Sequence, residues 1–161
     1  MVKIEKIELP NNEFYEGEVV NNKKHGKGTF TFSDGGKYIG DWQNDKRHGK
    51  GVENFPDGYV YDGEYKDDLK HGFGFVNSGD GNYYEGMWEN GSPNGKGKLT
   101  KPDSSIYEGQ FLDGLQEGAG KLTFNRDGKE ISISGNWFKN FLHGKAEEIE
   151  DEIITKHQYY Y

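Results

Sequence analysis

The chain has 161 residues, a formal net charge of −8 at pH 7 and no cysteine, and 31% of its residues are hydrophobic even with tyrosine counted. The absence of cysteine excludes disulfide bonds and cysteine-based metal sites, and the negative charge disfavours nucleic-acid binding. The length fits one domain, with a thin core rather than a thick aliphatic one.

The first six residues carry charges where a signal peptide needs an apolar run, and no stretch approaches the roughly 20 apolar residues of a membrane-spanning helix. A soluble, cytoplasmic protein is therefore expected. Low hydrophobicity and net charge also fit a disordered chain, but disordered chains lack so many aromatic residues in regular register.

An internal repeat organises the chain from Tyr15 onward. A tyrosine, any residue and a glycine recur at a constant step, at Tyr15, Tyr38, Tyr61, Tyr84 and Tyr107, and a Gly-x-Gly pair keeps the same step. Such a period is typical of arrays whose units bury surface against their neighbours. Because every recurring residue type is structural, an enzyme is disfavoured and no catalytic residue is predicted. The glycines predicted to be structural are Gly17, Gly26, Gly28, Gly40, Gly49, Gly51, Gly63, Gly72, Gly74, Gly86, Gly95, Gly97, Gly109, Gly118 and Gly120.

Residues 1–14 precede the first tyrosine and are predicted to form half a repeat, a single capping strand. Two of their apolar residues, Ile7 and Leu9, fall one repeat step ahead of Phe30 and Phe32 in the next unit. Residues 15–146 are predicted to hold five regular repeats and a degenerate sixth.

The clearest copy runs from residue 38 to 60 and predicts two strands. Residues 38–42 alternate as a strand does, residues 44–48 are polar and indicate a loop, and residues 49–55 form the second strand. A Pro-Asp-Gly turn then leads into the next unit. The predicted fold class is all-β: an elongated single-layer antiparallel sheet of tandem 23-residue β-hairpins.

The two strands of a copy can be aligned residue by residue. Opposite charges placed directly across from each other favour a register by something like 0.2–1 kcal/mol per pair. The predicted pairs are Trp42 with Gly49, Gly40 with Gly51, Asp41 with Lys50, and, in the first repeat, Glu18 with Lys27.

Residues 147–161 are predicted to be an acidic C-terminal cap, with a short capping helix over about 147–157. Ile149, Ile153 and Ile154 share a helical face, and the acids lie toward the N-terminal end, where the helix dipole favours them. A frayed acidic tail is the alternative.

Two segments carry a family resemblance. Tyr-Glu-Gly-Glu followed by Lys-His-Gly-Lys-Gly over residues 15–28, and Tyr-Glu-Gly-Met-Trp followed by Gly-Lys-Gly over residues 84–97, resemble the MORN repeat, "membrane occupation and recognition nexus". The resemblance extends over residues 7–146, although Val19 replaces a ring in the first copy and Asn94 and Glu117 replace histidine. It implies a twisted sheet with a groove along one face that serves as a scaffold in cytoskeletal assemblies and ciliary axonemes. Radial-spoke-head proteins are the nearest resemblance.

A partner groove is the first candidate site. Strand alternation places eight aromatic residues on one face of the sheet, where their exposed edges are predicted to line a groove for a peptide or helix of another protein. The alternative is that these rings are simply the core. The groove residues are Tyr38, Trp42, Tyr61, Tyr65, Tyr84, Trp88, Tyr107 and Phe111.

A basic loop edge is the second candidate. It is either a solvated edge or an attachment point for an acidic protein or anionic lipid, with each charge contributing at most about 1 kcal/mol near a membrane. Its residues are Lys23, Lys24, His25, Lys46, Arg47, His48, Lys70 and His71.

No metal or cofactor is predicted. The histidines recur once per hairpin and so lie about 9–10 Å apart, whereas zinc needs its ligands at about 2 Å from one point. The Gly-x-Gly segments lead into strands, whereas a phosphate-binding loop needs a helix start.

The function predicted from these features is that of a non-enzymatic scaffold that holds a partner segment in the aromatic groove, in a cytoskeletal or ciliary axonemal, radial-spoke-like complex. One alternative is a peripheral membrane adaptor that binds anionic phospholipid through the basic loop edge. Another is a self-associating structural protein, since open sheet edges tend to pair.

Overall fold

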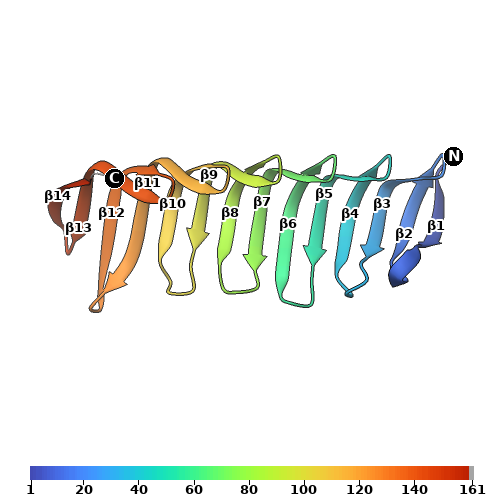
Figure 1. Ribbon diagram of the computed structural model, residues 1–161, viewed down its shortest axis with the longest axis horizontal. Coiled ribbons are helices and arrows are strands. Elements are labelled where there is room, and N and C mark those ends of the chain that lie inside the picture. The colour runs from blue at the N-terminus through green and yellow to red at the C-terminus, as the bar shows by residue number, and fades with distance from the viewer. Residues whose placement is uncertain (160–161) are drawn as a thin grey trace. The chain divides into compact units, whose positions relative to one another are not determined.

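The computed structural model describes residues 1–159, and all 14 strands found there form one antiparallel open sheet in chain order (Figure 1). The all-β fold class is confirmed. The other element in this range is a short 3₁₀ turn, η1 (Pro10–Asn12), between the first two strands. The strands are β1 (Lys3–Glu8), β2 (Phe14–Val20), β3 (Lys23–Thr31), β4 (Lys37–Gln43), β5 (Lys46–Asn54), β6 (Tyr59–Lys66), β7 (Leu69–Ser78), β8 (Tyr83–Glu89), β9 (Ser92–Thr100), β10 (Ile106–Leu112), β11 (Leu115–Arg126), β12 (Lys129–Phe138), β13 (Phe141–Glu150) and β14 (Ile153–Tyr159).

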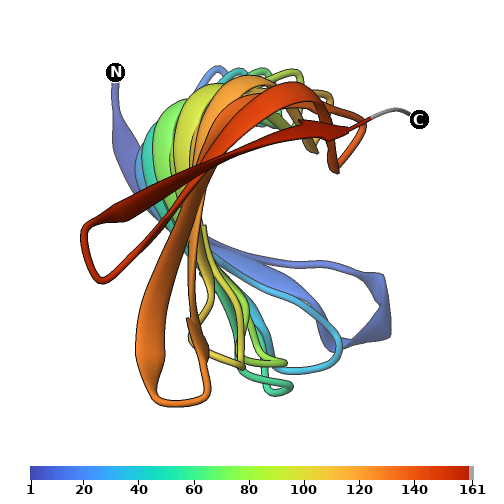
Figure 2. The same ribbon diagram turned by 90° about the vertical axis from the view of Figure 1, so that its left-hand side faces the viewer.

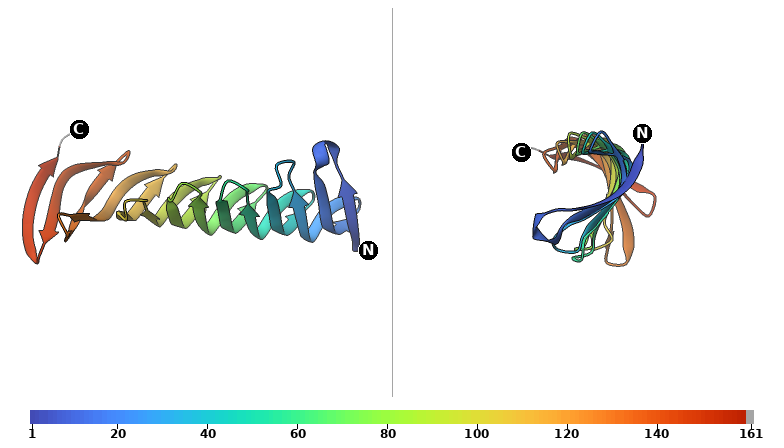
Figure 3. Two further views of the ribbon diagram at one scale, coloured as in Figure 1. Left: turned by 90° about the horizontal axis from the view of Figure 1, so that it is seen from below. Right: turned by 90° about the vertical axis from the view of Figure 1, so that its right-hand side faces the viewer.

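The chain divides into two compact units by its internal contacts. Unit 1 consists of residues 1–80 with residues 89–91, and unit 2 consists of residues 81–88 with the chain from residue 92 onward. The strands are twisted and bent rather than flat, as the end views show for β12 and β13 of unit 2 (Figure 2) and for β1 and β2 of unit 1 (Figure 3). Within the described residues, no helix has the length and apolar character needed to cross a membrane.

The hairpins close at one edge through two-residue turns. In Asn44–Asp45 and in Asp67–Asp68 both residues have positive φ, which is the conformation of a type I′ turn, whose twist matches that of the strands it joins. Asn and Asp tolerate this left-handed backbone better than most residues do. The predicted loop over 44–48 is therefore too long, because residues 46–48 already belong to β5.

A β-bulge corrects the predicted register. Gly40 pairs with Gly51 as expected, but the register then shifts and Trp42 lies opposite Arg47 instead of Gly49. Gly49 has a φ of +68°, so it occupies the left-handed region that glycine adopts without strain. The prediction missed this bulge because the charges alone fitted a regular ladder.

The acid at the bulge also has different partners from those predicted. Asp41 accepts a hydrogen bond from the backbone N–H of Lys50 at 3.0 Å, and its ion pair at 2.6 Å is with Lys27 on β3. Glu18 likewise accepts from the backbone N–H of Lys27 at 3.1 Å. The predicted side-chain pairs of Asp41 with Lys50 and of Glu18 with Lys27 are therefore wrong, and the acids stabilise the bulge amides.

The predicted capping helix over 147–157 is wrong, because these residues form the end of β13, a turn and β14. Asp151 and Glu152 form the turn, both with positive φ. Glu148 and Glu150 accept hydrogen bonds from the guanidinium of Arg126 at 2.7 and 2.9 Å. These pairs form across the sheet, and they satisfy acids that the prediction assigned to a helix dipole. Residues 160–161 of the predicted cap lie outside the described residues.

Candidate partner-binding faces

A tyrosine lies over a cross-strand glycine pair in each of the five regular repeats. A Cβ added to Gly40 would lie 2.5 Å from the Cα of Gly51, and one added to Gly51 would lie 2.4 Å from the ring of Tyr38. The Tyr38 hydroxyl donates to the backbone carbonyl of Asp41 at 2.9 Å. The same i to i+3 bond is made by Tyr15, Tyr61, Tyr84 and Tyr107, at 2.8, 3.0, 2.9 and 3.1 Å.

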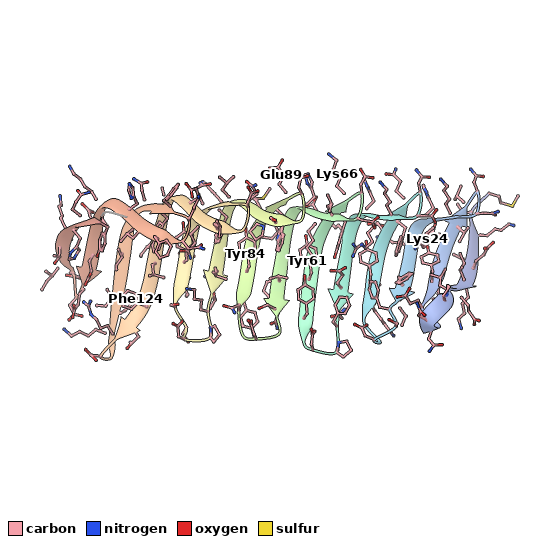
Figure 4. The ribbon with its side chains drawn as sticks, in the orientation of Figure 1. Lys24, Tyr61, Lys66, Tyr84, Glu89 and Phe124 are labelled. Carbon is pink, nitrogen blue, oxygen red and sulfur yellow. The ribbon has the colours of Figure 1, made fainter. Side chains whose placement is uncertain are left out.

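Edge-to-face contacts join these rings into a continuous layer within each unit. Tyr38 contacts Trp42 of its own strand at 5.2 Å between ring centroids and Tyr65 of the next repeat at 5.1 Å. In unit 2, Tyr84 contacts Phe111 of the next repeat at 5.0 Å. We call the side of the sheet that carries these rings the aromatic face. Figure 4 labels Tyr61 on β6 and Tyr84 on β8.

The eight predicted groove rings are buried. Their exposed fractions range from 0% for Tyr38 and Tyr61 to 7% for Trp88. The predicted exposed edges are therefore absent, because each ring is covered by glycine backbone and by rings of neighbouring repeats. All eight belong to the core: Tyr38, Trp42, Tyr61, Tyr65, Tyr84, Trp88, Tyr107 and Phe111.

Burial changes the acid–base chemistry of the tyrosines. Loss of solvent contact is the main cause, and it raises the pKa of Tyr15, Tyr84 and Tyr107 to about 12. The pKa values of Tyr38 and Tyr65 are raised further for the same reason, with nearby carboxylates as a smaller cause. The phenol groups therefore stay neutral in the folded protein.

Three cations of the predicted basic edge turn over the aromatic layer instead of projecting from loops. We call Lys24, Arg47 and Lys70 the cation column, since they stand at the same position of β3, β5 and β7 (Figure 4 labels Lys24). The Lys24 ammonium lies 4.4 Å from the Trp42 ring centroid, and the Arg47 guanidinium lies 5.1 Å from that of Tyr65. Such cation–π contacts contribute about 0.5–2 kcal/mol each.

The other residues of the predicted basic edge differ in their exposure to solvent. Lys23 and Lys46 are exposed at the starts of their strands, whereas His25, His48 and His71 are half-buried. In the described residues, no three His, Asp or Glu side chains gather in an arrangement that could hold a metal ion. The predicted edge is thus not one exposed basic row.

Glu53 is a buried acid among the core rings of unit 1. Its side chain is 7% exposed, and its carboxylate forms ion pairs with Arg47 and, at 3.8 Å, with Lys70. The Lys70 ammonium also donates to the hydroxyl of Tyr59. Burial lowers the pKa of Lys70, and the nearby Glu53 carboxylate partly offsets that effect.

Sequence reasoning missed Glu53, although the repeat contains the signal that identifies it. At the equivalent position the other regular repeats have Phe30, Val76, Leu99 and Leu122, all apolar. A charged residue at a position that is apolar in the other copies indicates an interaction that this copy makes and the others do not.

A strip of partly exposed rings runs along the other border of the aromatic face in unit 1. Phe32 and Phe55 stack at 5.3 Å between centroids, and Phe55 contacts Tyr59 at 5.9 Å. All three are half-buried. We call these three residues the ring strip. Sequence alternation did not select them because they stand at strand ends and turns.

Comparison with known families covers most of the chain. The family model described as "MORN repeat" matches six segments, residues 15–37, 38–58, 61–83, 84–106, 107–129 and 134–149. The first five segments begin at the tyrosines of the regular repeats, and the last falls on β12 and β13. No curated protein matches the chain.

Proposed function

The chain belongs to the MORN-repeat family, and we propose from this that it is a non-enzymatic scaffold or adaptor whose unit 1 binds a segment of a partner protein on the aromatic face. Repeats of this family are generally structural or binding elements rather than catalysts. The observation that carries the proposal is the ring strip at the border of the aromatic face: its three rings stay half-exposed, and no second layer formed by residues 1–159 covers them, since all strands in that range belong to one sheet.

The accessible atoms of this face differ from those of the eight predicted rings. The ring strip of Phe32, Phe55 and Tyr59 offers half-exposed aromatic surface, and the cation column offers partly exposed charge. A segment that covers the strip removes apolar area from water, and each Å² contributes roughly 25 cal/mol before the costs of association are counted. Polar atoms of the same segment can contact Lys24, which forms no ion pair with any described residue.

The setting we propose is a cytoskeletal or ciliary axonemal complex, of which a radial-spoke-like assembly is one form. This part of the proposal is supported by the family resemblance alone. Lipid attachment through a basic edge has less support, because Lys24, Arg47 and Lys70 cover the protein's own rings.

Crosslinking mass spectrometry of the protein purified gently from its source tests the scaffold. We expect crosslinks from Lys24, Lys46 and Lys70 to one defined segment of another protein. We also expect Phe55→Ala to reduce co-purification of that protein, whereas Ile4→Ala, which removes an exposed apolar side chain from the opposite face of the same unit, leaves it unchanged. Recovery of the chain crosslinked to itself alone, or equal effects of the two variants, would contradict the proposal.

A further inference from the structure

The opposite face of unit 1 carries apolar residues at positions that are polar in most other repeats. Ile39, Phe73 and Phe75 alternate away from the tyrosine–glycine positions and so lie on this face. Position 39 is acidic in every other regular repeat, as Glu16, Asp62, Glu85 and Glu108; position 73 is Lys27, Lys50, Lys96 or Ala119; position 75 is Thr29, Val52, Lys98 or Lys121.

These substitutions leave large apolar side chains in water. Ile39 is 50% exposed, Phe73 is 51% exposed and Phe75 is 37% exposed. Val52, the cross-strand neighbour of Ile39, is half-buried beside it. Lysine or threonine stands at the positions of Phe73 and Phe75 in most other copies, so the repeat fold does not require rings there. The departures therefore indicate a surface that is covered by another molecule.

Two adjoining hollows lie among these residues. One, of about 290 Å³, is lined by Phe73 and Phe75 with Asp62, Glu64 and Lys50. The other, of about 430 Å³, is lined by Ile39, Val52 and bare glycine backbone, and it shares Lys50 and Asp62 with the first. Because the two hollows share these two residues, one bound segment can reach both.

The charges of the first hollow favour a cationic occupant. Asp62 and Glu64 are exposed, and neither carboxylate forms an ion pair with a described residue. In the preceding repeat the equivalent of Glu64, Asp41, is neutralised by Lys27 at 2.6 Å. Phe73 and Phe75 flank the two acids, and a guanidinium or ammonium group is attracted both to carboxylates and to ring faces.

We propose that this surface is a docking site for a protein segment that places an arginine or lysine between Phe73 and Phe75 and an apolar side chain over Ile39 and Val52. Two strand spacings separate Val52 from Phe75, a distance of about 9–10 Å. In the polyproline II conformation, which has three residues per turn and a rise of about 3.1 Å per residue, side chains three positions apart lie on the same side of the chain, about 9 Å apart. The segment therefore carries its basic and apolar residues three positions apart. This surface lies on the other face from the proposed scaffold site, so the two proposals can fail independently.

A designed pair of peptides tests the docking site. The probe is a capped tetrapeptide with arginine first, leucine fourth, and glycine and serine between them, and the comparison peptide carries citrulline in place of arginine. Titrated into the ¹⁵N-labelled full chain, the arginine peptide is expected to shift the amide signals of Asp62, Phe73, Phe75 and Val52. The citrulline peptide should bind at least about tenfold more weakly, as expected for loss of a charge-assisted contact.

Matched variants distinguish binding at this site from a general attraction between the cationic peptide and the negatively charged protein. The double variant D62N/E64Q should weaken binding of the arginine peptide about tenfold or more, whereas Glu85→Gln, at the position equivalent to Asp62 in the next repeat, should not change it. Lys50→Gln should tighten binding, since it removes the one cation of the hollow. Equal affinity for the two peptides, shifts centred on Arg47 and Glu53, or shifts at Phe73 that depend on protein concentration without peptide would overturn the proposal; the last would mean that a second copy covers this face.

Discussion

At the scale of single residues, the tyrosine and its two glycines form the unit on which the repeat depends. The ring occupies the space that glycine side chains would need, and its hydroxyl satisfies a backbone carbonyl at the bulge. A side chain added to either glycine would meet backbone atoms on one side and the buried tyrosine ring on the other, and neither can move away.

We expect Gly40→Ala to destabilise the protein by about 2–4 kcal/mol, because the new Cβ would lie 2.5 Å from backbone atoms that cannot move away. The free energy of unfolding from urea titration measures the loss. Gly128→Ala is the control: its φ is +83° but nothing lies within 4 Å, so it reports backbone strain alone, about 1 kcal/mol. Equal losses in the two variants would show that the clash over the glycine pair is unimportant.

Glu53 permits a second prediction at this scale. Glu53→Leu restores the apolar residue of other copies but leaves the half-buried Lys70 without its carboxylate and Arg47 with Asp68 alone, and we expect it to cost about 1–3 kcal/mol. Adding Arg47→Gln and Lys70→Gln should recover most of that loss, since the fifth repeat combines Gln116 with Leu122. Strictly additive losses in chemical denaturation would show that the three charges do not act together.

At the scale of the element, the turns connect each hairpin to the one before it. The N–H of Asp68 donates to the carbonyl of Arg47 at 2.9 Å, and the Asp68 carboxylate accepts from the N–H of Arg47 at 2.8 Å. Asp45 forms the same two bonds with Lys24. The carboxylate of the turn aspartate thus accepts a backbone N–H that would otherwise need the carbonyl of one more strand residue.

The turn at Asp68 gives the third prediction. Asp68→Asn should cost about 0.5 kcal/mol or less, because an asparagine makes the same bond at Asn140 and the change removes one ion pair, the partly exposed contact with Arg47 at 3.3 Å. Asp68→Gly keeps the left-handed backbone but loses the acceptor, and we expect a cost of about 1 kcal/mol. Thermal denaturation of the two variants side by side measures the difference. A larger loss for asparagine than for glycine would contradict this role.

The elements also show which features of the sequence were sufficient for prediction. The constant step from Tyr15 to its successors predicted the hairpins and the glycine pairing of Gly40 with Gly51, because those residues have one arrangement that avoids a clash. The helix over 147–157 was predicted wrongly because three isoleucines fit either a helix or paired strands. Only the cross-strand acids near Arg126 decide between them.

The candidate sites were harder to predict than the fold. Alternation identifies which face a ring takes, but exposure depends on how closely neighbouring repeats approach, and that approach buried all eight predicted rings. The inward turn of Lys24 and Arg47 depends on the turn length, which the sequence did not specify to the residue. The exposed Phe73 could have been recognised by comparison with Lys27 and Lys50.

At the scale of the whole molecule, each strand is ordered next to its neighbours in the chain, so contacts are local in sequence. Local contacts allow fast folding and make stability a sum over units and their interfaces. Self-association remains a prediction at this scale, and sedimentation at several protein concentrations tests it.

The buried tyrosines predict alkaline unfolding. Their pKa is 10.0 when exposed and about 12 for Tyr15, Tyr84 and Tyr107 in the folded state, so the unfolded chain loses these protons first. Stability is therefore complete below pH 10 and falls as the pH rises from 10 toward 12. Lys24 and Lys70, whose pKa values are lowered by burial, act in the opposite direction but are fewer.

Phenolate absorbance and circular dichroism, followed together through an alkaline titration, measure this effect. We expect the buried tyrosines to ionise together with the loss of β-structure. Ionisation of every tyrosine near pH 10 with the sheet intact would contradict the burial described above.

The tyrosine of each regular repeat packs on glycines of the same repeat, so each repeat carries its own part of the core. This affects how the number of repeats can change during evolution. Within unit 1, neighbouring copies meet through the same kind of ring contact and the same backbone bond at the turn, so an in-frame gain or loss of one whole repeat inserts or removes a module without requiring a new core. Residues on the opposite face of the sheet take no part in these ring contacts, so they can change without disrupting the contacts. Mutation can therefore alter one copy, as at Phe73 and Phe75, while most other copies have lysine or threonine at these positions.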